Sequence, residues 1–356
     1  MSIAVYIHSA AVLNAASDPR GDQFGDQPGT SPAPQPLAFD PTRRAFALAT
    51  PSLARDLFDR KIQRSVEPQG LRLLHCVASL APSLAALQLP PTRIALTAAI
   101  PEVDAPSPCW EAVQAIGEQP QKVLAPLLAN TPPLHALTLL NSSVMAYVAE
   151  ALECHGPMAG FCSQDNAGLD ALIEAAQQIA EQRADAALVV SSSPNLTPAL
   201  YLREPKPPAE VIFGEGAAAL LLAATPAPNN TNALRIVGFT RGYSADPQRA
   251  AAVGAKVIEK VLNAQKLRLS DVQNIVANLD DPLLENLFAE HPQGTRSSRS
   301  VTGELGASAL LTEIALTLQQ RQAAAPTPGH TLLVSHSRAG HWGALLLLSE
   351  TMEKHT

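Results

Sequence analysis

Short apolar runs alternate with longer segments of helical period along most of this chain, and no other feature of the sequence limits the fold as strongly. The run Gly216–Ala224 contains only Gly, Ala and Leu, which is typical of a strand buried on both faces. The segment Gly168–Arg183 instead repeats its apolar residues every three or four positions, as a helix packed on one face does. Alternating strands and helices predict an α/β fold in which buried sheets are covered by helices.

The expected strands are short apolar or β-branched runs: Ile3–His8, Ile94–Ala98, Met158–Cys162, Ala186–Ser191, Gly216–Ala224, Leu234–Thr240, Asn274–Asn278, Thr331–Ser335 and Trp342–Ser349. The expected helices have apolar residues at helical spacing: Leu71–Leu87, Ala136–Glu153, Gly168–Arg183, Ala250–Lys266, Pro282–Ala289 and Thr302–Arg321. Stretches rich in Gly, Pro and polar residues separate them and are expected to be loops: Ser17–Pro41, Glu204–Pro208, Thr225–Asn232 and Ala323–Gly329. Each half of the chain ends in adjacent apolar strands, so we expect two similar halves, residues 1–230 and 231–356.

The composition is that of a folded protein with an aliphatic core. Apolar residues make up 46% of the 356 residues and charged residues 16%, while aromatic residues are only 4%. A net charge of −7 argues against a nucleic-acid partner, which needs a basic face. No apolar run reaches the roughly 18 residues of a membrane span. Met1–Ala16 lacks the basic start and apolar stretch of a signal peptide, so a cytoplasmic location is expected.

The four cysteines, Cys76, Cys109, Cys154 and Cys162, form no CxxC pair and no Cys/His cluster. We therefore expect neither structural zinc nor a disulfide framework, and we interpret the thiols as reduced packing or surface residues. The histidines are scattered along the chain, and no metal site is assigned. No GxGxxG or GxxxxGKS/T motif follows an expected strand, so no nucleotide cofactor is expected.

Three stretches occur together in a fixed order. The first is Gly156-Pro157, followed by a short strand and by Ser163–Ala171; the second is Phe213–Leu220; the third is Arg299–Leu305. In this order and spacing they resemble the β-ketoacyl synthases of fatty acid and type II polyketide assembly, and the resemblance extends from about residue 71 to the C-terminus. It implies the thiolase fold, which has five layers, α-β-α-β-α, built from two similar halves.

The resemblance implies a catalytic thiolate at a helix N-terminus, where the helix dipole and free N–H groups lower the pKa of a thiol. The family's cysteine lies three residues before a Gly and eight after the Pro of the Gly-Pro pair. Counted from Gly168 and Pro157, both positions are Asp165. A carboxylate there is a good helix N-cap but a poor thioester acceptor. Cys162 comes three residues earlier, inside the expected strand, and would miss the helix N-terminus.

The other catalytic positions implied by the resemblance also differ from the family. Asn278 stands where the family has its first catalytic histidine, and Glu304 stands where it has the second. Arg299 replaces the family's lysine and Glu313 matches its glutamate partner, so we expect an Arg299–Glu313 ion pair as a buried structural contact. The family's Gly-rich loop near the C-terminus is here Ser337–Trp342, whose Arg and Trp are expected to fill the space left for an acyl thioester.

The nucleophile, both histidines and the Gly-rich loop are thus absent together, while the scaffold is kept. In this the chain is similar to the chain-length factors of type II polyketide synthases, and its divergence resembles those of Gram-negative aryl polyene clusters. The best-known members have Gln at the cysteine position, whereas here Gln164 is one residue early. The decarboxylase role suggested for that Gln is therefore not transferred to Gln164.

The resemblance also implies a heterodimer with an active ketosynthase, joined through the strand before the nucleophile position. The residues expected in this interface are Met158, Ala159, Gly160, Phe161 and Cys162. An apolar strand edge left unpaired would promote aggregation, which also favours a partner.

The partner's acyl tunnel is expected to end on this chain. The gate residues expected on a helix near residue 108 are Trp110, Val113, Ile116 and Gly117. The acidic net charge disfavours direct docking of an acidic acyl carrier protein, so that contact is expected to be indirect.

Two alternative interpretations remain open. The first is a thiolase-fold acyltransferase or malonyl decarboxylase with an altered site, using Asp165, Glu304 or Cys162, because paired carboxylates can perform acid–base chemistry. The second is a purely structural partner that stabilises a ketosynthase without shaping its product.

Overall fold

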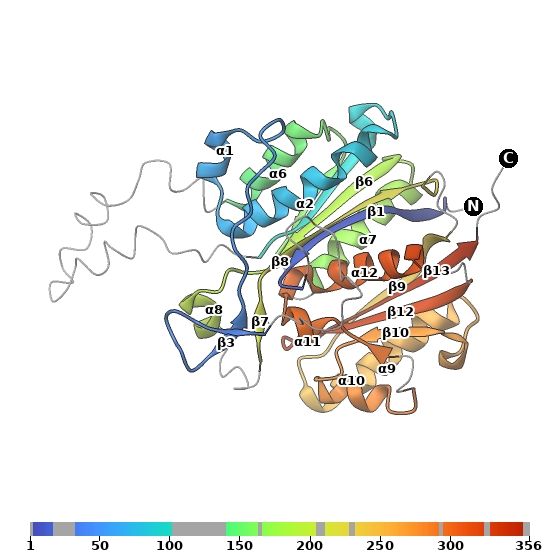
Figure 1. Ribbon diagram of the computed structural model, residues 1–356. Helices are drawn as coiled ribbons and strands as arrows, with labels where there is room; N and C mark the ends of the chain where they lie inside the picture. The colour runs from blue at the N-terminus through green and yellow to red at the C-terminus, as the bar shows by residue number, and fades with distance from the viewer. Residues whose placement is uncertain are drawn as a thin grey trace.

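A ten-stranded sheet forms the centre of the computed structural model, which describes residues 3–16, 33–101, 140–162, 166–203, 211–227, 232–291, 295–323 and 328–351. The strand order is β11-β10-β12-β13-β9-β1-β8-β6-β4-β5. The strand bounds are β1 Val5–Asn14, β4 Ile94–Ala99, β5 Met158–Phe161, β6 Ala186–Ser192, β8 Gly216–Ala223, β9 Asn232–Tyr243, β10 Asn274–Ala277, β11 Thr295–Arg296, β12 Gly329–His336 and β13 His341–Thr351. A small second sheet at one end of the molecule joins β2 Gln35–Pro36, β3 Arg44–Phe46 and β7 Phe213–Gly214 (Figure 1).

The described helices are α1 Arg60–Ser65, α2 Pro68–Ala85, α6 Asn141–Ala151, α7 Ala167–Ala180, α8 Pro198–Arg203, α9 Pro247–Asn263, α10 Pro282–Leu287, α11 Arg299–Thr302 and α12 Ala309–Ala323. Two of them begin with an aspartate cap followed by proline at the first helical position. Asp246 accepts from the backbone N–H of Gln248 before α9, and Asp281 accepts from that of Leu283 before α10. No helix within these described ranges is long and apolar enough to cross a lipid bilayer.

The sheet repeats one pattern on either side of its centre. The strands β1-β8-β6-β4-β5 are matched by β9-β13-β12-β10-β11, and β1 joins β9 over Val5–Ile7 and Leu234–Ile236. In each set, the strand that comes first in the chain pairs antiparallel with the strand that comes last: β1 with β8, and β9 with β13. Two further strands of each set run parallel to each other, β4 with β6 and β10 with β12. Both first strands contain a bulge, at His8 in β1 and at Val237 in β9. This repetition supports the division at residues 230 and 231, which stays a prediction.

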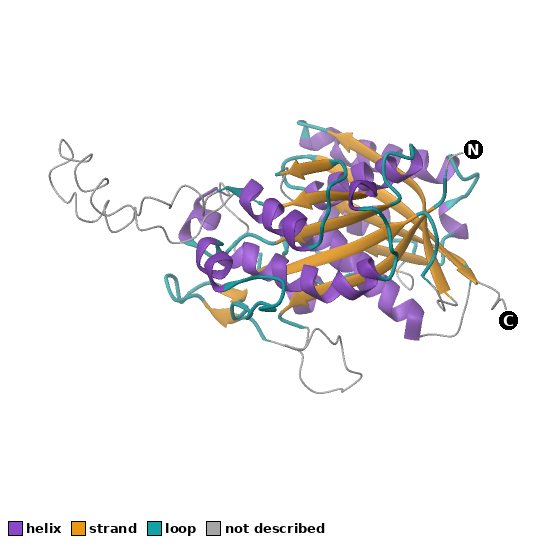
Figure 2. Ribbon diagram, turned by 90° about the horizontal axis from the view of Figure 1, so that it is seen from above, coloured by secondary structure: helices purple, strands orange, loops and turns teal. Residues whose placement is uncertain are grey.

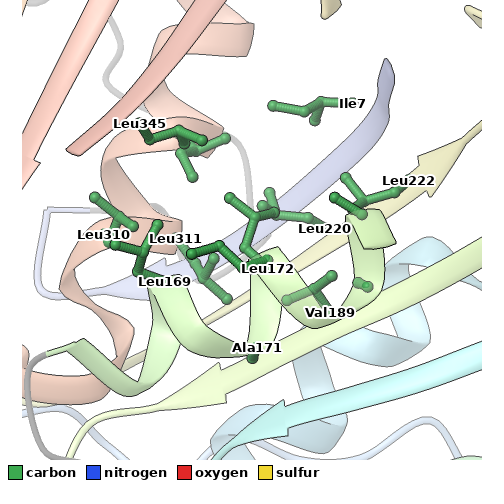
Figure 3. Close-up of a cluster of buried hydrophobic side chains, with 14 of the residues drawn as sticks. Ile7, Leu169, Ala171, Leu172, Val189, Leu220, Leu222, Leu310, Leu311 and Leu345 are labelled. Atoms are coloured by element: carbon green, nitrogen blue, oxygen red, sulfur yellow. The ribbon is translucent and has the colours of Figure 1, made fainter. Parts of the chain in front are cut away.

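Helices lie in three layers around the two sets of strands (Figures 1 and 2). Helices α2 and α6 cover the outer face of the first set, and α9 and α10 cover the outer face of the second. Helices α7 and α12 lie between the sets and pack on both. Figure 3 shows apolar side chains of this middle layer: Ile7, Leu169, Leu172, Leu220, Leu310, Leu311 and Leu345. The arrangement is α-β-α-β-α, as predicted, and its core is aliphatic because the chain has few aromatic residues.

The helix predicted over Thr302–Arg321 is wrong as one continuous element. The chain forms α11, leaves the helix at Gly303 and starts α12 only at Ala309. Gly303 has a φ of +73°, and a Cβ there would lie 2.8 Å from the backbone carbon of Phe213. The interruption lets Glu304 pair with Phe213 of β7, which helical periodicity alone does not reveal.

His8, at the bulge in β1, is a buried histidine. Its side chain is 7% exposed, and neither ring nitrogen has a hydrogen-bond partner in the described part of the chain. Burial lowers the pKa of His8, because the charged imidazolium would lose its hydration. The folded state therefore disfavours the charged form of the ring.

We expect His8 to make the protein less stable in mild acid. Below the unfolded-state pKa of about 6.5, the unfolded chain binds a proton that the folded chain does not, so stability falls with pH by up to about 1.4 kcal/mol per pH unit. The loss continues until the pH passes through the lowered folded-state pKa. Denaturant midpoints between pH 7.5 and 5 measure this, and His8→Phe should remove its share of the slope. An unchanged slope in that variant would contradict the assignment.

Candidate functional site

A cavity of about 80 Å³ lies where β10 and β12 end and α11 and α12 begin. Because β10 and β12 are parallel neighbours, their carboxyl ends meet at the same edge of the sheet. Four of the residues that stand at family catalytic positions, by the resemblance described above, line this cavity: Asn278, Arg299, Glu304 and Glu313. Segments far apart in the sequence thus converge at this cavity.

Two of these residues neutralise each other. The Arg299 guanidinium and the Glu304 carboxylate form a close ion pair that is mostly buried. The backbone N–H of Gly306 also donates to Glu304 Oε1 at 3.0 Å. The Glu304 carboxylate is thus engaged by the guanidinium and by a backbone amide of the chain itself.

The predicted Arg299–Glu313 ion pair is wrong. Glu313 Oε1 instead accepts hydrogen bonds from the Ser298 backbone N–H at 2.6 Å, from Ser298 Oγ at 2.8 Å and from Ser297 Oγ at 3.4 Å. Burial raises the pKa of Glu313, although these hydrogen bonds and the charge of Arg296 act in the opposite direction. The glutamate holds the turn before α11 in place, and Arg299 is left to pair with Glu304.

Asn278 belongs to the turn that follows β10. Its side-chain oxygen accepts from the backbone N–H of Asp280 at 3.1 Å, as in an Asx turn. An amide engaged in this way cannot exchange protons as an imidazole would. The position of the family's first histidine therefore has a structural role.

A histidine and an aspartate that the sequence analysis did not assign to the site form a close pair beside it. His336 Nδ1 lies 2.6 Å from Asp281 Oδ2, and His336 lines the cavity. Burial by itself would raise the pKa of Asp281, but the hydrogen bonds from His336 and from the backbone of α10 lower it overall. In the sequence, this pair is indicated only by an aspartate before Pro282, which suits a helix N-cap, and by a histidine that directly follows the strand expected over Thr331–Ser335.

The altered loop near the C-terminus is a tight hairpin turn between β12 and β13. The Ser337 N–H donates to the carbonyl of His341 at 2.8 Å. The expectation that Arg338 and Trp342 fill the acyl space needs correction. Trp342 is fully buried against α9, where a Cβ on Gly254 would lie 2.6 Å from its ring. The Trp342 ring also stacks on the ring of His336. Arg338 lies over the ring of Phe213.

The N-terminus of α7, where the family keeps its nucleophile, lies at the edge of the cavity. Asn166, the residue before α7, is buried and accepts a hydrogen bond of 2.8 Å from Ser335 Oγ, and Ser335 lines the cavity. Asp165 itself lies outside the described residues. The four expected gate residues also lie outside them: Trp110, Val113, Ile116 and Gly117.

No thiol lines the cavity among the residues that the structure describes. Cys76 and Cys154 are buried in the core, and burial raises the pKa of the Cys154 thiol to about 12 and that of Cys76 still further. Cys162 is exposed at the end of β5. Thiols with raised pKa values are poor nucleophiles, because the reactive species is the thiolate. Within the same ranges, no three His, Cys, Asp or Glu side chains gather into a metal-binding group.

Strand β5, the expected interface, is the last strand at one end of the sheet. Among the described residues it pairs only with β4. Met158 is 47% exposed, and Gly160 and Cys162 are also exposed, while Phe161 packs on the core. The strand therefore has exposed small and apolar side chains, and the backbone groups on the side away from β4 form an edge of the sheet.

Comparisons with known proteins identify the fold. No protein-family model matches the sequence, and no curated protein sequence matches it. Among solved structures, the ishigamide ketosynthase/chain length factor is similar with a TM-score of 0.73 at 15% identity, over 97% of this chain and 99% of that chain. A β-ketoacyl synthase from Burkholderia phymatum STM815 has a TM-score of 0.70 at 15% identity, over 98% and 100% of the two chains.

A third structure is a ketosynthase, ApeO, in complex with its chain length factor, ApeC, from Xenorhabdus doucetiae. It has a TM-score of 0.69 at 15% identity, and 98% of each chain is covered. These matches extend over nearly the whole length of the chain. The protein therefore has the thiolase fold of the ketosynthases, as its sequence predicts.

Proposed function

We propose that this protein is a non-condensing ketosynthase-like subunit, a chain-length factor, that pairs with an active ketosynthase and shapes its acyl tunnel. One observation carries the proposal. Among the described residues, the family's two histidine positions are Asn278 and Glu304, which is paired with Arg299, and no thiol lines the cavity; the imidazole that does line it, that of His336, is engaged by Asp281. These groups occupy the site with internal contacts and supply no nucleophile for condensation.

The proposed partner is an active ketosynthase bound along β5. The exposed edge of this strand supports a pairing surface, and two of the similar structures are described as a ketosynthase with a chain length factor. An obligate interface of this kind would bury more than roughly 2,000 Å² in total. Contact with the acyl carrier protein is proposed to be indirect, through the ketosynthase. An aryl polyene product remains a prediction from the sequence.

Co-expression with an active ketosynthase from the same genome tests the pairing. We expect a stable one-to-one complex by size-exclusion chromatography and light scattering, and an aggregating chain when this subunit is expressed alone. A well-behaved soluble monomer would count strongly against an obligate pair.

A loading assay separates this proposal from an acyltransferase or malonyl decarboxylase. The purified subunit is incubated with malonyl- and acyl-carrier protein, and intact-protein mass spectrometry follows decarboxylation and covalent loading. We expect neither reaction above a control without protein. Turnover that is lost in Glu304→Gln or Asp165→Asn would favour the catalytic alternative.

Replacing the predicted gate residue tests the role in product length. Trp110 is the one large aromatic among the four predicted gate residues, so Trp110→Ala is expected to lengthen the products of the reconstituted complex. Val113→Ala is the matched control, because it removes much less volume. Product lengths are read by mass spectrometry. Lengths that do not respond to any gate variant would favour the purely structural partner.

A cytoplasmic location is part of this proposal. We expect the cysteines to be reduced there, as in other reducing compartments. Fractionation of cells that express a tagged full-length chain tests this location.

A further inference from the structure

A second cavity, of about 210 Å³, lies toward the opposite end of α12 from the candidate site. It forms where β10 and β12 begin and where the second half of α12 packs over them. The residues that line it are all polar: Asn274, Arg296, Thr317, Gln320, Arg321 and Thr331. No carboxylate and no aromatic ring is among these lining residues, so the cavity has the chemistry of a site for an anion without a planar base.

Two arginines face this cavity. Burial lowers the pKa of Arg296, and the nearby positive charge of Arg321 lowers it further, while Glu313 acts in the opposite direction. The Glu313 carboxylate, which binds Ser297 and Ser298 at the other cavity, compensates part of the charge of Arg296. Two guanidinium groups that line one cavity make its electrostatic potential positive, which favours an anionic ligand.

The Arg296 guanidinium is held in position by a short chain of hydrogen bonds. Its Nη2 donates to Thr317 Oγ1 at 2.9 Å, and that hydroxyl donates to the backbone carbonyl of Glu313 at 2.8 Å. A guanidinium fixed in this way loses little freedom when it binds a ligand, and its planar set of donors suits an oxyanion.

Thr331 supplies an independent observation that points to a ligand. Its side chain is 1% exposed and lines the cavity, yet its hydroxyl has no hydrogen-bond partner among the described residues. A buried hydroxyl left without a partner is costly. An oxygen of a bound anion would accept a hydrogen bond from the Thr331 hydroxyl and remove that cost.

We propose that this cavity binds a phosphate-type oxyanion, held by the guanidinium groups of Arg296 and Arg321 and by the hydroxyl of Thr331. The volume suits a small tetrahedral anion with some water, since one water takes about 30 Å³ in the liquid. The site is separate from the positions of the family's catalytic residues, so it stands or fails independently of the proposed function.

Phosphorus NMR tests the site on the full-length chain, in the assembly in which it purifies. Inorganic phosphate is titrated at constant ionic strength, and saturable broadening of its signal is expected. Arg321→Gln should weaken binding at least tenfold, because one of two charge-assisted contacts is lost. Thr331→Val, which is nearly isosteric, should weaken it several-fold without affecting the fold. Arg249→Gln is the matched control, an exposed arginine elsewhere, and should bind as the unmodified chain does.

Further titrations identify the source of the anion. Tight binding of methyl phosphate indicates a phosphate ester, and binding of inorganic phosphate alone indicates free phosphate; both support the site. Acetate is expected to compete only weakly. The proposal is overturned by the absence of saturable binding, by equal affinity in all variants, or by acetate binding as well as phosphate.

Discussion

Gly160→Pro is expected to separate this chain from the proposed ketosynthase partner while its own fold persists. The carbonyls of Pro157, just before β5, and of Phe161 accept from the backbone N–H groups of Leu96 in β4 and of Ile100 just after it, at 3.0 and 3.1 Å. Because backbone groups alternate in direction along a strand, those of Met158 and Gly160 point to the opposite, outer edge. Proline at 160 removes an outward N–H and puts a ring in its place, and it leaves the bonds to β4 intact.

The expected effect is a large loss of affinity for the partner. A missing hydrogen bond that leaves an unsatisfied acceptor costs about 1–3 kcal/mol, which is roughly tenfold to a hundredfold in the dissociation constant. Steric exclusion by the ring adds to this. Gly160→Ala is the matched control, because it keeps the N–H and its Cβ would meet only the flexible Met145 sulfur, at 3.2 Å.

Size-exclusion chromatography and analytical ultracentrifugation of the co-expressed pair give the result. Circular dichroism of the released chain shows whether its secondary structure is kept. If Gly160→Pro and Gly160→Ala associate equally well with the ketosynthase, β5 is not the pairing edge.

The order of helices and strands could be predicted from the sequence because each signal is local. The run Gly216–Ala224 reads as a strand buried on both faces, and β8 is that strand. Asn278, Glu304 and Glu313 could be assigned to positions of one family site, but only from the spacing of motifs in that family. Neither composition nor periodicity places those three residues together.

The pairing of side chains within the site could not be predicted. The choice of Glu304 over Glu313 as the partner of Arg299 depends on Gly303, whose positive φ ends α11 and turns Glu304 back toward the guanidinium. The Asp281–His336 pair depends on the parallel register of β10 and β12, which brings two strand ends together across more than fifty residues of sequence. Hydrophobic periodicity carries no information about register between distant strands.

Arg72 and Glu215 form a buried ion pair that joins α2 to the strand entering β8. Arg72 is 1% exposed; it donates to Glu215 Oε1 at 3.1 Å and to the side-chain oxygen of Asn195 at 2.9 Å. The other oxygen of Glu215 accepts from the Leu48 N–H at 3.0 Å. Burial lowers the pKa of Arg72, while the nearby Glu215 carboxylate raises it. The negative charge of the Glu215 carboxylate is thus compensated by the Arg72 guanidinium.

Arg72→Met is therefore expected to destabilise the protein by about 3–5 kcal/mol, because the substitution leaves a buried carboxylate and a buried amide oxygen without their cation. The denaturant midpoint of the same assembly, compared with the unmodified chain, measures the loss. Arg93→Met is the matched control: its pair with Asp185 has the same chemistry, but the side chains are 35% and 44% exposed, so solvent already screens them. A similar loss in both variants would mean that removed packing, rather than an uncompensated buried charge, sets the effect. A negligible loss in Arg72→Met would mean that water or a rearranged donor reaches Glu215, and the pair would then have little part in holding α2 to the sheet.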